Sequence, residues 1–222
     1  MTHELIREKG VRFSGPAGLI EGRVGQEPGN HAKALVVLHP HPQYGGSMDN
    51  NVVATAVRAG QACGFVTLRF NFRGVCGSEG EYGDGLGEQD DVAAALHYLR
   101  TGLSVKTAVL LGYSFGACVG LAFCHRAAHG VDHLILISPP PVLMAKELSL
   151  EIPVVGKIVL GENDDIAPPE ALRSIVSGEK REALIEVIPK ADHFFWAREK
   201  ILEERIRKLL SDGGACGGIA ST

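Results

Sequence analysis

The sequence VKTAVLLGYSFGACVG, residues 105–120, joins an apolar run to a serine flanked by glycines. The apolar run, Val105–Leu111, is typical of a buried strand, and a helical pattern starts at Phe115. Between them, Gly112 and Gly116 flank Ser114 in the spacing G-x-S-x-G, which is typical of a tight strand-to-helix turn that holds a nucleophilic serine in a strained backbone conformation. The alternative interpretation is an ordinary turn whose serine only caps the helix.

Strand and helix patterns alternate on both sides of this turn. Strands are predicted at 11–13, 19–24, 34–38, 65–70, 134–137, 158–160 and 184–188, and helices at 50–63, 88–99, 115–128, 170–176 and 196–210. This alternation predicts an α/β fold with a mostly parallel sheet covered by helices on both faces. Right-handed crossovers then bring the loops that leave the parallel strands to one edge, where we expect the catalytic residues.

Length and composition predict a single domain of ordinary globular type. We assign residues 1–212 to this domain, and residues 213–222, which are rich in small side chains, to a flexible C-terminal tail. The net charge is −4 without a basic run, which argues against nucleic-acid and membrane-surface partners. The N-terminus lacks an apolar signal core, no apolar run has the length of a membrane span, and the five cysteines are scattered. These features predict a cytoplasmic protein with reduced thiols.

A serine hydroxyl needs a general base, and His193 is the candidate. It lies in the sequence ADHFF, between the last predicted strand and the last predicted helix. His125, His129 and His133, spaced by four residues, are an alternative metal set. This alternative is disfavoured because Gly130 should break the helix and no cysteine or carboxylate completes the set.

The acid that orients the histidine is expected in residues 161–168, GENDDIAP, which follow a predicted strand. Asp164 is the preferred residue and Asp165 is the alternative. The chain order serine, aspartate, histidine is the order in which a hydrolase with a nucleophile elbow carries its triad. The competing interpretation of this segment is a solvated acidic turn.

Two backbone N–H groups should face the developing oxyanion. One is expected from Phe115, the residue after the nucleophile, and the other from the loop 39–47. Prolines 40 and 42 cannot donate, which leaves His41 as the preferred donor and Tyr44 as the alternative. We expect the side chain of His39 to brace this loop by hydrogen bonds, because a metal site formed by His39 and His41 would lack a third ligand.

The motifs GYSFG, GENDD and ADHFF resemble those of the α/β-hydrolase superfamily over nearly the whole chain. HPHPQYGGSMDN, LRFNFRG and GEQDD more narrowly resemble compact, lidless bacterial predicted serine esterases of the dienelactone-hydrolase-like branch. The resemblance implies an eight-stranded sheet, hydrolysis without metal or cofactor, the triad Ser114, Asp164 and His193, and oxyanion donors at His41 and Phe115. Dienelactone hydrolases themselves use a cysteine nucleophile, and Cys76 stands where related sequences more often carry glycine. We assign Cys76 no role.

The absence of a lid is expected from the spacing after the predicted strand at 134–137. About twenty residues separate Ile137 from Ile158, too few for a helical cap, so the site should be open and shallow. Apolar residues at 194–196 and 142–144 either line an acyl pocket or belong to the core.

The sequence therefore predicts a serine hydrolase that cleaves small-molecule carboxylic esters, with short acyl chains preferred. Two alternatives remain open. The same triad could serve a peptidase or acyl-peptide hydrolase, and the fold could serve as a binding module without catalysis.

Overall fold

The computed structural model describes residues 8–25, 32–126, 130–143, 155–175 and 185–212. The chain begins with two strands, β1 (Lys9–Gly15) and β2 (Gly18–Gly25), and then alternates between strands and helices. The later elements are β3 (Lys33–Leu38), α1 (Asn51–Ala62), β4 (Val66–Phe70), α2 (Leu86–Leu103), β5 (Thr107–Tyr113), α3 (Phe115–Cys124), β6 (His133–Ile137), β7 (Val155–Gly161), α5 (Pro169–Ile175), β8 (Ile185–Ile188) and α7 (Glu199–Asp212).

These strands form one eight-stranded sheet in the order β1-β2-β4-β3-β5-β6-β7-β8. The pairs β1–β2 and β2–β4 are antiparallel, and all the other pairs are parallel. The chain moves from β3 outward to β4 and then crosses back to β5 on the other side of β3. Such a reversal opens a crevice at the carboxyl ends of the two central strands, which is where ligands bind in open α/β sheets.

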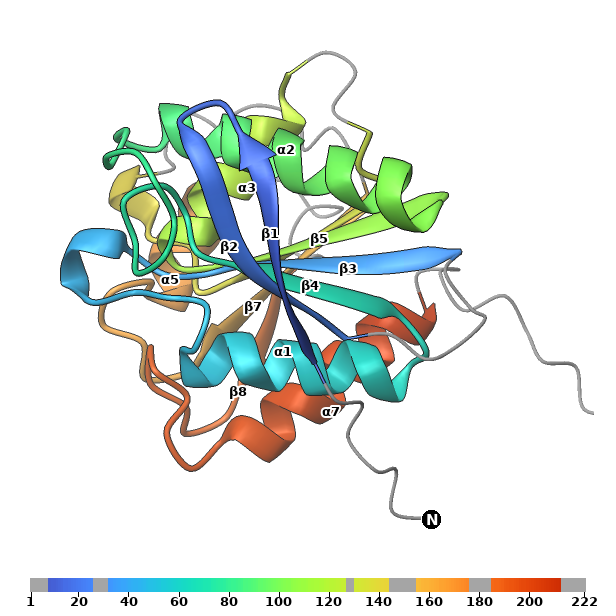
Figure 1. Ribbon diagram of the computed structural model, residues 1–222. Coiled ribbons are helices and arrows are strands. Elements are labelled where there is room, and N and C mark those ends of the chain that lie inside the picture. Colours follow the sequence, from blue (N-terminus) through green and yellow to red (C-terminus); the bar gives the residue numbers. More distant parts are fainter. Residues whose placement is uncertain (1–7, 26–31, 127–129, 144–154, 176–184, 213–222) are drawn as a thin grey trace, which may run out of the picture.

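Helices cover both faces of the sheet, as predicted (Figure 1). Alternate residues of β3 point to opposite faces: Val36 packs in the core beneath α2 and α3, while Val37 packs in the core beneath α1 and α7. Because strands buried on both faces need apolar residues at every position, the central strands read as unbroken apolar runs.

Three helices differ from their predicted bounds by more than one residue. The helix α2 spans Leu86–Leu103 rather than 88–99. The last helix begins at Glu199 rather than at 196, because Phe195 and Ala197 have positive φ values of 55° and 56° and therefore form turns. The helix α3 ends at Cys124 with His125 as its C-cap, short of the predicted end at 128, and residues 127–129 lie outside the described part of the chain. The predicted tail, 213–222, also lies outside it.

Candidate active site

Ser114 occupies the turn between β5 and α3 in a strained conformation, with φ 53° and ψ −119°. A non-glycine residue in such a conformation costs about 1–3 kcal/mol and persists only where its surroundings hold it. Here the Ser114 amide donates to the Ile137 carbonyl at 2.8 Å. A Cβ at Gly116 would lie 2.6 Å from the Leu38 and His39 carbonyl oxygens, so only glycine lets α3 approach β3 this closely. The strained backbone of Ser114 is the one expected from the G-x-S-x-G spacing.

The side chains of Ser114, His193 and Asp164 form one chain of hydrogen bonds. The Oγ of Ser114 lies 3.1 Å from Nε2 of His193, and Nδ1 of His193 lies 2.9 Å from Oδ1 and 3.0 Å from Oδ2 of Asp164. All three residues are buried, at 8%, 5% and 2% exposure. Asp165, the alternative acid, is exposed and makes no such contact with His193. The structure thus brings together the three side chains that the sequence singled out.

The Asp164 carboxylate is held in its charged form. Burial by itself would raise the pKa of this carboxyl, but hydrogen bonds from His193 and the Ala167 amide, with the nearby Ser138 hydroxyl, keep it below its ordinary value. The Ile166 amide also donates to Oδ1, at 3.0 Å. A carboxylate bound to Nδ1 requires the proton of a neutral His193 ring to sit on that nitrogen, which leaves Nε2 to accept the serine hydroxyl.

The loop that carries His193 is braced by residues that sequence reasoning missed. The Tyr113 hydroxyl donates to the His193 carbonyl at 3.0 Å, and the Asn51 side-chain amide donates to the Phe194 carbonyl at 2.9 Å. At Gly161, a Cβ would lie 2.5 Å from the Ala191 carbonyl oxygen, so this glycine lets the Asp164 and His193 loops approach each other. Tyr113 lies in the motif GYSFG and Asn51 directly follows GGSMDN, but neither motif tells which backbone group the side chain reaches.

The turn at Ser114 between β5 and α3 is the nucleophile elbow, or elbow for short. The loop after β3 lies beside the elbow, as expected for a loop that supplies an oxyanion donor. Its short 3₁₀ helix, Pro42–Tyr44, is closed by the Tyr44 amide, which donates to the His41 carbonyl at 3.1 Å. Because the Tyr44 amide is already engaged, the preference for His41 over Tyr44 as a donor is strengthened. The rings of His41 and Phe115 pack at a centroid distance of 4.7 Å, which places the two candidate donor residues next to each other.

His39 braces this loop with both ring nitrogens, as expected. Its Nδ1–H donates to the Pro40 carbonyl at 2.6 Å, and its Nε2 accepts from the Phe72 amide at 3.0 Å. Burial lowers the pKa of His39 to about 4, so the ring is neutral. A ring with both nitrogens occupied has no lone pair for a metal. Within the described ranges, no group of three histidine, cysteine or acidic side chains is placed to hold a metal ion.

Two histidines of the alternative metal set, His125 and His133, lie on different elements. His125 caps the end of α3, His133 begins β6, and His129 lies outside the described residues.

Among the described helices, none combines the length and apolarity needed to cross a bilayer.

The apolar residues near His193 divide between core and surface. Phe195 is fully buried in the core beneath α1 and α7, whereas Trp196 is 62% exposed. The Phe194 ring packs edge-on against His193 at 5.5 Å. Val142 and Leu143 are exposed, and Met144 lies outside the described residues. Cys76 is exposed with φ 49°, a left-handed conformation that favours glycine.

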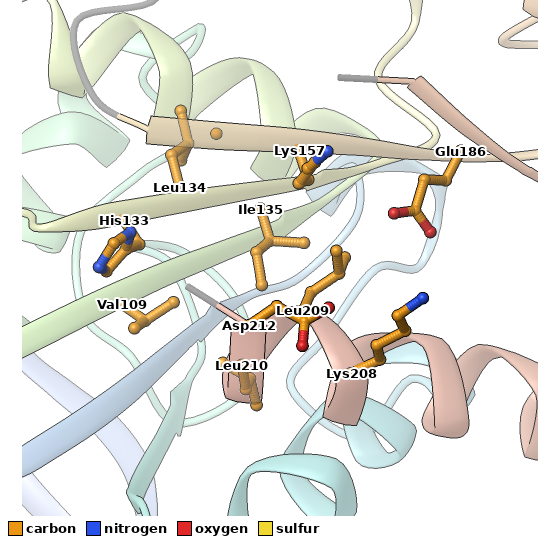
Figure 2. Close-up of a pocket in the computed structure, with 11 residues that line it drawn as sticks. Val109, His133, Leu134, Ile135, Lys157, Glu186, Lys208, Leu209, Leu210 and Asp212 are labelled. Atoms are coloured by element: carbon orange, nitrogen blue, oxygen red, sulfur yellow. The ribbon is translucent and has the colours of Figure 1, made fainter. Parts of the chain in front are cut away.

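Among the cavities in the described part of the chain, two lie at opposite edges of the sheet. One, of about 300 Å³, adjoins the elbow and is lined in part by His41 and Phe115. The other, of about 370 Å³, lies at the amino ends of the parallel strands, between His133 and Lys157 on the sheet and the last turns of α7 (Figure 2). Neither cavity is lined by a triad residue, but Phe115, which lines the first cavity, directly follows Ser114 in the chain.

Comparison with known proteins agrees with this architecture. Residues 34–183 match the family described as the alpha/beta hydrolase fold. An uncharacterized protein of Rickettsia prowazekii is 36% identical over 211 residues, which cover 91% of this chain and 87% of that protein. An alpha-beta serine hydrolase homologue from Coxiella burnetii is 31% identical, with a TM-score of 0.80 and coverage of 95% of this chain and 98% of that one. A lidless serine hydrolase from Xanthomonas campestris is 30% identical, with a TM-score of 0.79 and 97% of both chains covered.

Proposed function

The chain belongs to the α/β-hydrolase family, and from this premise we propose that it is a serine hydrolase that cleaves carboxylic esters with short acyl chains. The observation that carries the proposal is the unbroken path of hydrogen bonds from Ser114 Oγ through the His193 ring to the Asp164 carboxylate. A serine hydroxyl becomes a useful nucleophile only when a base within this distance can take its proton.

In the proposed reaction, Nε2 of His193 takes the hydroxyl proton while Ser114 Oγ attacks the ester carbonyl. The backbone N–H groups of His41 and Phe115 stabilise the resulting oxyanion. The bond from carbon to the alkoxy oxygen then breaks, and the alcohol leaves with the proton from Nε2. A water molecule, deprotonated by the same nitrogen, releases the acid from the acyl-enzyme. Throughout, Asp164 keeps the proton of the neutral ring on Nδ1 and stabilises the charged ring.

The test is hydrolysis of p-nitrophenyl acetate and butyrate by the wild-type protein and by Ser114→Ala. We expect the wild type to hydrolyse both esters and the variant to lose about three or more orders of magnitude in kcat/KM. Equal rates for the two proteins would refute the proposal.

A peptidase would use the same triad, and aminoacyl-p-nitroanilides separate the two activities. The proposal expects esters to be cleaved in preference to the anilides. If the anilides are the better substrates, the peptidase alternative is correct. If the folded protein cleaves neither class and Ser114 forms no fluorophosphonate adduct, the binding-module alternative is favoured.

A further inference from the structure

The cavity of about 300 Å³ beside the elbow has one aromatic wall. The rings of His41, Tyr82 and Phe115 pack against one another with centroid distances of 4.7 Å, 5.3 Å and 5.9 Å. The aliphatic side chains that also line it include Leu86 and Val119. A planar apolar group can pack face to face or edge to face on such a wall, and the volume falls at the lower end of ligand pockets, which hold about 300–1,000 Å³.

The position of the cavity identifies the part of an ester that would enter it. The alkoxy oxygen must leave beside Nε2 of His193, which protonates it. The cavity is lined by His41 and Phe115, the candidate oxyanion residues, and by none of the residues around Asp164 or His193. A substrate whose alcohol faces His193 and whose carbonyl oxygen faces His41 and Phe115 therefore directs its acyl group toward this cavity.

The aromatic wall carries one group that can donate a hydrogen bond to a ligand, the hydroxyl of Tyr82. The Gln43 amide donates to Nδ1 of His41 at 3.3 Å, so the neutral ring carries its proton on Nε2. That nitrogen lies 3.3 Å from the Tyr82 hydroxyl oxygen and donates to it. The hydroxyl hydrogen of Tyr82 is then directed elsewhere and can be donated to a ligand.

The segment that carries Tyr82 is fixed in place. The fully buried Glu88 side chain accepts from the amides of Gly83 at 2.9 Å and Gly85 at 2.8 Å, which ties the segment to the first turn of α2. A donor held by its surroundings before the ligand arrives binds with less loss of conformational entropy.

The charge around the cavity disfavours an anionic acyl group. Among the described residues that line it there is no lysine or arginine, whereas Asp84 is one of them. Burial lowers the pKa of His41, and the negative charges of Glu88 and Asp84 only partly oppose this, so the ring adds no positive charge at neutral pH.

We propose that this cavity is the acyl pocket and that it selects aromatic acyl groups bearing a neutral hydrogen-bond acceptor, with Tyr82 as the residue that donates to that acceptor. The inference rests on the proposed ester hydrolysis and adds to it the class of acid that is released.

The test compares p-nitrophenyl esters of 4-methoxyphenylacetic and 4-methylphenylacetic acid, in which a methylene group insulates the carbonyl from the ring substituent. The wild type should prefer the methoxy ester, and Tyr82→Phe should lower the methoxy-to-methyl ratio of kcat/KM by about three- to tenfold, the effect of one neutral hydrogen bond. The control is Tyr98→Phe, because Tyr98 stacks on Phe13 away from the cavity. This variant should keep the wild-type ratio.

Three outcomes overturn the inference. The first is the same methoxy-to-methyl ratio of kcat/KM in wild type and Tyr82→Phe, and the second is a higher kcat/KM for the 4-carboxyphenylacetate ester than for the methoxy ester. The third is that the wild type no longer prefers the methoxy compound when ethyl esters of the same acids replace the p-nitrophenyl esters. Parallel assays with p-nitrophenyl acetate separate this failure from failure of the proposed function. Acetate hydrolysis that depends on Ser114, together with an unchanged ratio, refutes only the pocket assignment. No hydrolysis of any ester refutes both.

Discussion

Asp164 and Asp165 are neighbouring carboxylates in opposite surroundings, and they show how far residue types alone can be interpreted. The GENDD turn predicts that an acid leaves the strand here, but it leaves two candidates open. The structure separates them because Asp164 turns inward to His193 while Asp165 faces solvent. The side chain that accepts from the backbone of its own turn, at Ile166 and Ala167, is the one whose orientation is fixed.

This difference predicts unequal effects of two matched substitutions. Asp164→Asn should lower kcat for p-nitrophenyl acetate by about 10⁴-fold, since an amide no longer enforces the ring tautomer that accepts the serine proton. Asp165→Asn removes an exposed carboxylate one position away and should change kcat less than about threefold. Steady-state kinetics of the two variants check this, and a similar loss in both would contradict the assignment of Asp164.

His39 predicts a dependence of stability on pH. Its pKa is about 4 in the folded protein, against 6.5 as the ordinary value, so the unfolded chain takes up a proton that the folded protein excludes. The stability that His39 contributes is complete above pH 6.5, and it is lost as the pH falls toward 4, by about 1.4 kcal/mol per pH unit at most.

Urea unfolding of the wild type and of His39→Gln at several pH values between 4 and 7 measures this contribution. The free energy of unfolding of the wild type should fall more steeply with decreasing pH than that of the variant, which lacks the titrating ring. Parallel pH dependences would contradict the account of His39.

At the scale of the elements, the elbow depends on how closely α3 approaches β3. The G-x-S-x-G spacing predicts the tight turn, and the distances at Gly116 show how closely α3 approaches β3 there. The start of α7 was predicted too early because the apolar character of 194–196 continues the helical pattern, whereas positive φ values at Phe195 and Ala197 interrupt it. Apolar periodicity reports burial, and a buried turn can imitate the beginning of a helix.

Two glycines of α3 provide a matched test of this packing. Gly116→Ala should destabilise the protein by about 1–3 kcal/mol, because its Cβ would meet backbone carbonyl oxygens that cannot move aside. At Gly120 the nearest atoms to an added Cβ are the ends of leucine side chains at 3.4 Å, an ordinary contact. Gly120→Ala should therefore be neutral or stabilise the helix by up to about 1 kcal/mol.

Thermal or urea unfolding of the two variants gives the comparison. If Gly116→Ala is as stable as Gly120→Ala, the close approach of α3 to β3 is not a requirement of the elbow.

At the scale of the whole molecule, the mostly parallel sheet with helices on both faces could be predicted from the alternation of apolar strands and helical patterns. The strand order could not be predicted, because apolar runs such as Val36–Leu38 and Leu134–Ile137 look alike in sequence. Only tertiary packing decides which strands lie next to each other in the sheet. The aromatic wall of the cavity beside the elbow could not be predicted from the sequence either. It brings Tyr82, from a segment without a periodic pattern, against His41 from the loop after β3 and Phe115 from the first turn of α3.

The same limit applies to the braces of the catalytic loops. Tyr113 and Asn51 reach backbone carbonyls of residues 193 and 194 that are far away in the chain. The sequence could identify the side chains that meet at the carboxyl edge of the sheet, and the fold was needed to identify what holds them there.

Reaction with a fluorophosphonate, followed by peptide mapping, tests the central claim most directly, since such a reagent captures a serine only where a base activates it. Wild-type protein should carry a single adduct on Ser114, and His193→Ala should react at least about a hundredfold more slowly. An adduct on another residue, no adduct on the folded protein, or labelling of His193→Ala at the wild-type rate would contradict the claim that His193 activates Ser114.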